Sequence, residues 1–263
     1  MNTPRHLSVA TGTRLAARPA SRKWNVRTAH LPQPAPIVRE LPRTRRYEVR
    51  FADERGDVQE FVRIAPALPA FEAGFNAFTH GALIMTTTGP VAVEDLEPGM
   101  YLETASGRAV ELKWLGAITL VPGAPCAEPG QSRTYRVCAD AFGLGRPASD
   151  VTLGPGARLL NRSPDLRATL GTEGALAPVA DFADGMSVVE LTPVSPVRVY
   201  HLALNGHEVI YANGIEVESF HPGPQTALSL STEMADFFLG LFPHITRFED
   251  FGRMLWPRAD EMS

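Results

Sequence analysis

The sequence predicts an all-β body that carries a helical C-terminal extension and a disordered, basic N-terminal arm. Glycine and proline are frequent, with 22 and 23 copies among 263 residues, which indicates a chain that turns often. Short apolar runs alternate with turn sequences over residues 83–220, as expected for strands joined by tight turns. After residue 224 the apolar spacing changes to a helical period, which predicts the extension.

The composition is that of a globular protein. Hydrophobic residues make up 44% of the chain and charged residues 21%, which argues against a disordered or fibrous chain. No apolar run approaches the roughly 18 residues that a membrane-spanning helix needs, so no transmembrane segment is expected. No apolar stretch follows the early charges, so no secretory signal is seen. A cytoplasmic location is therefore the default expectation, with a transit peptide or secretion by a non-classical route left open.

The first 46 residues form a basic arm. They contain ten Lys and Arg against the single acid Glu40, together with six prolines. Such a segment cannot bury much apolar area, and we expect it to be disordered. The rest of the chain is acidic, so the arm has three candidate contacts: nucleic acid, an anionic membrane surface and this protein's own body. A solvated tail without a specific partner is the simplest alternative.

Order is expected to begin with a β-hairpin. Apolar residues alternate with polar ones over 47–51 and recur over 58–64, and residues 53–57 supply a turn between them. This pattern predicts two paired strands, the first of which begins at Tyr47. Two prolines then mark residues 65–74 as a short linker into the main body.

Strand signals recur along the main body, separated by turn sequences such as Pro-Gly, Ser-Gly and Asp-Gly. The predicted strands are 83–86, 91–93, 100–104, 109–115, 117–121, 133–138, 188–191 and 197–204.

Two Asn-Gly pairs near the end of the body give the clearest local signal. Asn205-Gly206 and Asn213-Gly214 separate the strand-like runs 197–204, 207–212 and 215–219. Asn-Gly favours a type I′ turn because both central residues of that turn take positive φ. The sequence therefore predicts a three-stranded meander here.

The C-terminal extension, residues 222–263, is expected to be helical. Ser231 or Thr232 provides an N-cap and Pro243 a stop, and a second, weaker helical pattern covers 245–255. The first stripe is rich in aromatic residues, so it should pack on the body; contact with an unknown protein partner or a membrane surface is the alternative. The stripe consists of Leu230, Met234, Phe237, Phe238, Leu241 and Phe242.

Motifs of common enzymes are absent. The chain has no Gly-x-Ser-x-Gly elbow, no phosphate-binding Gly-x-x-x-x-Gly-Lys loop and no His-Glu-x-x-His pair. The Gly-Leu-Gly at 143–145 is followed by Arg146 and Pro147, and this proline would break the helix of a dinucleotide site. The histidines are scattered, and Cys126 and Cys138 lie at no metal-binding spacing. We predict no cofactor and no metal, and whether the two cysteines pair stays open.

Three segments together resemble a known family. Residues 77–84 read Ala-Phe-Thr-His-Gly-Ala-Leu-Ile, and residues 93–100 read Val-Glu-Asp-Leu-Glu-Pro-Gly-Met. A middle stretch, 142–160, is followed by a closing stretch, 199–220, that contains the second Asn-Gly pair. In this order they are similar to the stand-alone bacterial form of the Hint (hedgehog/intein) domain, over residues 75–221.

The resemblance implies both a fold and a reaction. Hint domains are compact, disc-like all-β bodies whose two pseudo-symmetric halves bring the chain's ends together. Their chemistry is self-cleavage or protein splicing. The first side chain, a nucleophile, attacks the preceding carbonyl, while a Thr or Ser and a His of the middle segment polarise the scissile peptide. In splicing members a terminal His-Asn pair releases the other end.

This chain departs from that pattern at each reacting position. The nucleophile position holds Ala77, and the middle hydroxyl and imidazole positions hold Gly154 and Ala157. The terminal pair reads Glu218-Ser219. Loss of the nucleophile alone costs on the order of 10⁶ in rate. We therefore expect a catalytically degenerate module that acts as a scaffold or interaction domain and not as an enzyme.

Two alternatives remain open. Thr79 and His80 lie next to the vacated position, and His207 matches a histidine of the family's last segment, so Thr79 is a candidate substitute nucleophile for self-cleavage. Thr79 is two residues off register, which shifts a strand side chain by about 7 Å. The other alternative is a binding protein whose basic arm contacts nucleic acid or anionic surfaces.

Overall fold

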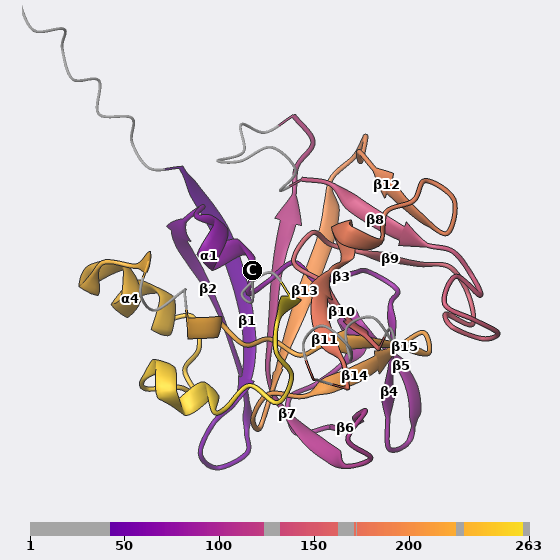
Figure 1. The fold of residues 1–263 in the computed structure, drawn as a ribbon. Coiled ribbons are helices and arrows are strands. Elements are labelled where there is room, and N and C mark those ends of the chain that lie inside the picture. Colours follow the sequence, from indigo (N-terminus) through magenta and orange to yellow (C-terminus); the bar gives the residue numbers. More distant parts are fainter. Residues whose placement is uncertain (1–42, 124–131, 163–170, 172, 225–228, 260–263) are drawn as a thin grey trace, which may run out of the picture. The chain divides into compact units, whose positions relative to one another are not determined.

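The computed structural model describes residues 43–123, 132–162, 171, 173–224 and 229–259. These residues belong to one compact unit, drawn in Figure 1. Residues 1–42 of the predicted arm lie outside the described residues, as does Cys126. None of the described helices is both long and apolar enough to cross a membrane.

The described chain is mostly antiparallel β-structure with a short C-terminal helix, which confirms the predicted fold class. The strands are β1 (Thr44–Ala52), β2 (Val58–Pro66), β3 (Phe78–Thr79), β4 (Leu83–Thr86), β5 (Gly89–Ala92), β6 (Tyr101–Glu103), β7 (Ala109–Leu120), β8 (Thr134–Val137), β9 (Val151–Leu153), β10 (Arg158–Asn161), β11 (Ala175–Pro178), β12 (Val188–Leu191), β13 (Val197–Leu204), β14 (Val209–Ala212) and β15 (Ile215–Glu218). The helices are α1 (Pro69–Glu72) and α4 (Thr232–Leu239), with 3₁₀ turns at Val93–Asp95, Val179–Phe182 and Phe248–Phe251.

Strands β7 and β13 form the centre of the sheet. They pair antiparallel from Val197 opposite Leu120 to Leu204 opposite Leu112, and they run side by side in Figure 1. The strand order is β11-β10-β15-β14-β4-β6-β7-β13-β3-β9-β8-β12; in addition β1 pairs with β7, β2 pairs with β1, and β5 pairs with β4. Because β7 also pairs with β1 and β6, this strand connects the hairpin to the rest of the sheet.

The predicted hairpin is present as β1 and β2, which pair over their full lengths. β1 begins at Thr44, three residues earlier than expected, so residues 44–46 are not part of a disordered arm. Their charges are held in place: Arg45 pairs with the buried carboxylate of Glu72 and donates to the Thr119 carbonyl. The expected linker contains α1, which starts at a proline, a residue favoured in the first helical turn.

A glycine that the sequence suggested as a strand break lies in the middle of a strand. The expected strands 109–115 and 117–121 are one strand, β7, with Gly116 inside it. A Cβ added to Gly116 would lie 2.1 Å from Cη2 of Trp114 and 2.5 Å from Cδ1 of Phe75. Gly116 is therefore required by close aromatic packing and not by a turn.

The predicted meander is half correct. Asn213 and Gly214 take φ of 49° and 88° and join β14 to β15 in an antiparallel hairpin, as the Asn-Gly rule predicts. Asn205-Gly206 does not form a hairpin, because β13 pairs with β7 and β3 while β14 pairs with β15 and β4. The Gly206 N–H donates to the Leu204 carbonyl two residues back. The chain therefore bends here, between β13, which pairs with β7 and β3, and β14, which pairs with β15 and β4.

Four short strands, β3, β9, β10 and β11, were not predicted. They are two to four residues long, which is too short for an alternating pattern to stand out. Several also have both faces covered, as in β3, where Phe78 and Thr79 are both buried. A strand buried on both faces shows no polar alternation.

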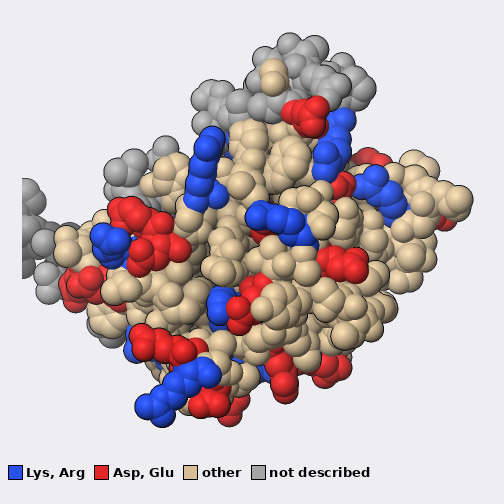
Figure 2. All heavy atoms as spheres, turned by 90° about the horizontal axis from the view of Figure 1, so that it is seen from below, with Lys and Arg blue, Asp and Glu red and all other residues tan. Residues whose placement is uncertain are grey.

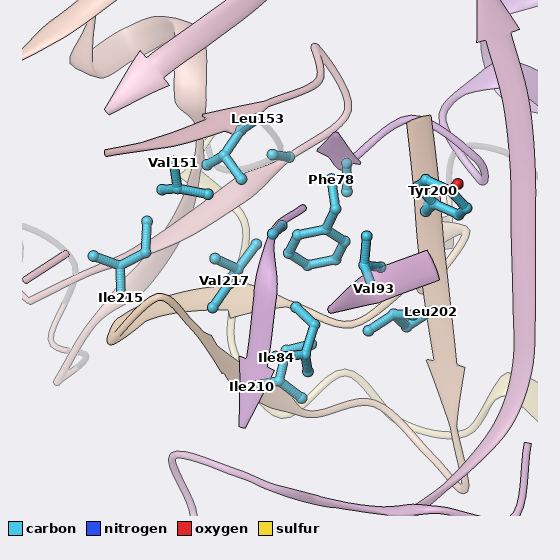
Figure 3. Close-up of a cluster of buried hydrophobic side chains, with 14 of the residues drawn as sticks. Phe78, Ile84, Val93, Val151, Leu153, Tyr200, Leu202, Ile210, Ile215 and Val217 are labelled. Atoms are coloured by element: carbon cyan, nitrogen blue, oxygen red, sulfur yellow. The ribbon is translucent and has the colours of Figure 1, made fainter. Parts of the chain in front are cut away.

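Two large hydrophobic clusters and a smaller one around Leu160, Leu176 and Val209 stabilise the fold. The module core gathers side chains from β3 to β15; Figure 3 shows the Phe78 ring in its middle, with Val93 and Leu202 to one side and Val217 to the other. The aromatic cluster lies around Trp114 and joins the β1–β2 hairpin, α1 and the C-terminal extension. Its largest members are Tyr47, Phe71, Phe75, Trp114, Phe220, Phe238, Phe242 and Phe251.

The C-terminal extension is less helical than expected. α4 is capped by Ser231, whose hydroxyl accepts a hydrogen bond from the Met234 N–H, and this part of the prediction is confirmed. The second helical pattern, 245–255, is wrong, because only Phe248–Phe251 forms a 3₁₀ turn before Gly252 takes a φ of 84°. The aromatic spacing there serves contact with the aromatic cluster, which includes Phe251.

Candidate functional site

The segment around Ala77 is held between two other segments by its backbone. The Ala77 N–H donates to the Tyr200 carbonyl at 2.9 Å, and the Ala77 carbonyl accepts from the Gly154 N–H at 2.8 Å. The Asn76 carbonyl, which precedes Ala77, accepts from the Gly156 N–H at 3.2 Å. The first and middle segments of the resemblance therefore meet at one place, and Ala77 is fully buried there.

The glycines of the middle segment leave no room for side chains. A Cβ on Gly154 would lie 2.0 Å from the Asn76 carbonyl oxygen and 2.7 Å from its carbon. A Cβ on Gly156 would lie 2.0 Å from Oδ1 of Asn76. Ala157 is also buried, with 1% of its surface exposed. The Asn76 backbone thus occupies the space into which a side chain at position 154 would project.

Restoring a hydroxyl at the middle position is expected to damage the fold. We predict that Gly154→Thr lowers the free energy of unfolding by about 1–3 kcal/mol, because the Asn76 backbone must move to admit the new side chain. Urea unfolding would measure the loss. Leu144→Thr, on a loop side chain that is 95% exposed, is the control and should change stability little. An unchanged midpoint for Gly154→Thr would contradict the close packing.

The substitute candidates Thr79 and His80 are engaged elsewhere. The buried Thr79 hydroxyl donates to the Thr152 carbonyl at 2.8 Å. His80 is mostly exposed, and its Nδ1 lies 3.0 Å from the Glu94 carboxylate. The structure therefore does not bring these two side chains together as a nucleophile and its base.

The terminal pair lies in a buried network of hydrogen bonds. Ser219 is fully buried, and its hydroxyl accepts from the Glu208 N–H at 2.9 Å. Glu218 Oε1 lies 3.0 Å from Nε2 of His207 and accepts from Nε and Nη2 of Arg258 at 3.0 and 2.9 Å. His207 Nδ1 accepts from the Leu255 N–H at 3.0 Å, so the ring proton sits on Nε2 and points at the carboxylate.

This network keeps Glu218 charged although it is buried. Burial raises the pKa of Glu218, but the hydrogen bond from His207 and the charges of Arg258 and Arg158 outweigh it and bring the pKa down to about 2. A carboxylate that stays ionised accepts hydrogen bonds and donates none. The position that the resemblance assigns to the terminal reaction therefore holds a structural anion.

Sequence reasoning missed Arg258, the main partner of Glu218. It lies on a strap, residues 252–258, that crosses the end of the module: the Gly252 carbonyl accepts from His221, and the Pro257 carbonyl accepts from the Leu176 N–H. Nη2 of Arg258 also donates to the His221 carbonyl. An arginine forty residues from its partner in an irregular segment has no periodic signal, so no pattern in the sequence predicts this pair.

A further buried imidazole, that of His201, lies next to Tyr200, whose carbonyl accepts from the Ala77 N–H. The resemblance assigns it no role. His201 is 3% exposed and lies against the rings of Phe78 and Phe220, with centroid distances of 6.0 and 5.3 Å. Its Nδ1 accepts from the Leu202 N–H, and burial lowers the pKa of His201 to about 3. It is therefore neutral at physiological pH.

The described residues contain no group of three or more His, Cys, Asp or Glu side chains that could hold a metal ion. A hollow of about 560 Å³ lies on one face of β1, β2, β7 and β13 and is lined by both signs of charge, including Arg50, Glu60, Glu94 and Arg198. Its lining includes Tyr200, whose carbonyl accepts from the Ala77 N–H, but not Asn76, Ala77, Gly154 or Gly156.

Solved intein structures are similar to the chain. The bacterial intein-like domain from Clostridium thermocellum is 12% identical with a TM-score of 0.38, covering 55% of this chain and 99% of that one. The gp41-1 intein is 11% identical with a TM-score of 0.36, covering 55% and 98%. The DnaB intein from Synechocystis is 14% identical with a TM-score of 0.34, covering 55% and 99%. No curated protein matches the chain.

The Hint domain model matches residues 76–224. This range begins one residue before Ala77, includes both glycines that pack on Asn76, and ends after the terminal pair. It spans more than half of the 263 residues. The chain therefore belongs to the Hint domain family.

Proposed function

We propose that this Hint domain is catalytically silent and serves as a scaffold or interaction module. The observation that carries the proposal is the packing at the Asn76–Ala77 junction. The first position has only a methyl group, and the backbone of Gly154 and Gly156 contacts Asn76 where reacting side chains would need space. Without a nucleophile the acyl transfer of the family has no first step.

The packing of the flanking segments also favours a structural role. Phe75, just before the junction, stacks edge to face on Trp114 at 5.0 Å, and Phe220, just after the terminal pair, lies 5.1 Å from Phe242. Both flanks therefore contribute to one aromatic cluster with Trp114. Cleavage at residue 76 would leave the two pieces in contact across a buried core. An autoprocessing domain works by releasing its flanks, and this arrangement opposes release.

The intact mass of the protein tests the proposal directly. We expect the full 28.5 kDa chain after expression and after incubation with thiol or hydroxylamine, because no thioester or ester forms. Ala77→Cys should also stay intact, since the middle segment still lacks its hydroxyl and imidazole.

Fragments would identify the rival activity. A product ending at Asn76 would show cleavage at the family's position, and one ending at Phe78 would show that Thr79 acts as the nucleophile. Thr79→Ala is the matched control, because it should abolish the second product and leave the first. Either product from the unmodified chain would overturn the proposal.

The face of the molecule in Figure 2 bears on the alternative of anion binding. Lys and Arg side chains are interspersed with Asp and Glu over this face. A surface that binds nucleic acid usually gathers positive charge in one patch or stripe, so the face drawn gives no support to that alternative. The arm's first 42 residues lie outside the described residues.

A further inference from the structure

One edge of β2 carries no neighbouring strand among the described residues. β2 pairs with β1 alone, and no backbone hydrogen bond from another described segment reaches its outer edge. The strand is nine residues long. An unprotected edge of this length is a template for pairing with a further strand, and natural proteins usually shorten, charge or cover such edges.

The side chains of β2 add exposed apolar residues to that edge, with the exposed Glu60 between them on the same side. Val58, Val62 and Ile64 project to the same side of the strand and are 46%, 51% and 60% exposed. The opposite side is partly covered, because Phe61 packs on Phe51 and Arg63 donates to the carbonyl of Gly240 at the end of α4. Single exposed apolar residues on loops are normal and need no explanation. Three exposed β-branched residues on one strand indicate a surface that contacts another molecule.

The strand is complementary to itself when two copies run antiparallel. Centred on Val62, the pairing overlaps all nine residues and sets Val62 against Val62, Glu60 against Ile64 and Phe61 against Arg63. This pairing places no like charges directly opposite each other. Like charges in that position would destabilise a strand pair. Within one chain the Arg63 guanidinium already lies 5.5 Å from the centre of the Phe61 ring, so the same contact is available across the pair.

We propose that two copies of this chain associate through antiparallel pairing of their β2 edges, centred on Val62. The inference rests on the proposed function, because it names the partner of a scaffold module as a second copy of the module. Main-chain hydrogen bonds supply the affinity of such strand addition, and the alternating side chains supply the register. The association continues each sheet into the other without using the junction at Ala77.

Association is tested on the full chain by sedimentation velocity or light scattering after gel filtration. The expected result is a species of twice 28.5 kDa that dissociates on dilution. Val62→Lys should raise the dissociation constant by about tenfold or more, because it buries a charge at the centre of the pair. Val194→Lys is the matched control: Val194 is 98% exposed in a loop, and its variant should dimerise like the parent. A parent chain that is monomeric at all concentrations would overturn the proposal.

The register is tested by oxidative cross-linking. In the proposed pairing, residue 62 faces itself, so Val62→Cys should form a disulfide between copies, identified by peptide mapping. Residue 58 faces Pro66, so Val58→Cys should not cross-link. Cross-linking at 58 and not at 62 would reject this register. The intact mass of the same samples reports on cleavage separately, so a monomeric but uncut chain would refute the dimer and leave the silent-module proposal standing.

Discussion

Arg258→Met is expected to lower the free energy of unfolding by about 3 kcal/mol. The substitution removes the guanidinium that donates two hydrogen bonds to Glu218, while the carboxylate stays buried. Removing one partner of a buried ion pair is costly because the remaining charge is less well compensated: among the described residues, Glu218 would keep only the hydrogen bond to His207 and the Arg158 guanidinium 3.8 Å away. The methionine keeps much of the volume, so packing contributes little to the loss. Chemical denaturation at neutral pH measures the change.

Two further variants separate this effect from a general loss of charge. Arg253→Met changes an exposed arginine of the same strap and should alter stability by less than about 0.5 kcal/mol. Adding Glu218→Gln to Arg258→Met should recover part of the loss, because the uncompensated charge is gone. If Arg258→Met and Arg253→Met lowered the free energy of unfolding by equally small amounts, the buried network around Glu218 would not contribute to stability as proposed.

Acid should destabilise the protein strongly between pH 6.5 and 4. Burial lowers the pKa of His201 to about 3 and the pKa values of His221 and His244 to about 4, from an ordinary value of 6.5. Below pH 6.5 these imidazoles bind protons in the unfolded chain but not in the folded one, so protonation favours unfolding. At pH 5 each histidine costs about 2 kcal/mol of stability.

The free energy of unfolding, measured by urea titration at several pH values, gives the test. His244 is the best residue to remove, because both of its ring nitrogens are buried without a hydrogen-bond partner among the described residues. His244→Leu should flatten the profile between pH 6.5 and 4 by about one third, without lowering stability at pH 7. The carboxylate of Glu218 enters only at lower pH, since its stabilising charge is lost as the pH falls toward about 2. A profile that is level from pH 6.5 to 5 would show that these histidines are protonated in the folded state.

The elements with a strong local pattern were predictable from sequence. β4, β12 and β13 have the expected boundaries, because apolar alternation and flanking turns specify them locally. The Asn213-Gly214 turn followed from its requirement for positive φ. Asn205-Gly206 has the same dipeptide and a different outcome, because the strands on either side already have other partners and tertiary pairing overrides the local preference.

The site was predictable in part. The resemblance predicts that Ala77, Gly154 and Ala157 lie close together, and in the structure the Ala77 carbonyl accepts from the Gly154 N–H. The roles that the resemblance assigns to these positions stay predictions. The motifs did not indicate that Gly154 and Gly156 are sterically required. In a sequence, a glycine looks the same whether a side chain at that position is merely unnecessary or would clash with its neighbours. The partnership of Glu218 with Arg258 depends on where an irregular strap runs, and no periodicity encodes that path.

The central pairing of β7 with β13 has a consequence for how the chain reaches its native state. The strands that form the middle of the sheet start at Ala109 and Val197, so the largest pairing joins residues far apart in sequence. Folding rates fall as such separations grow, and chains with this topology typically fold in milliseconds to seconds. Until β13 has been synthesised, β7 offers an open edge to other nascent chains. We therefore expect refolding yield to drop as protein concentration rises.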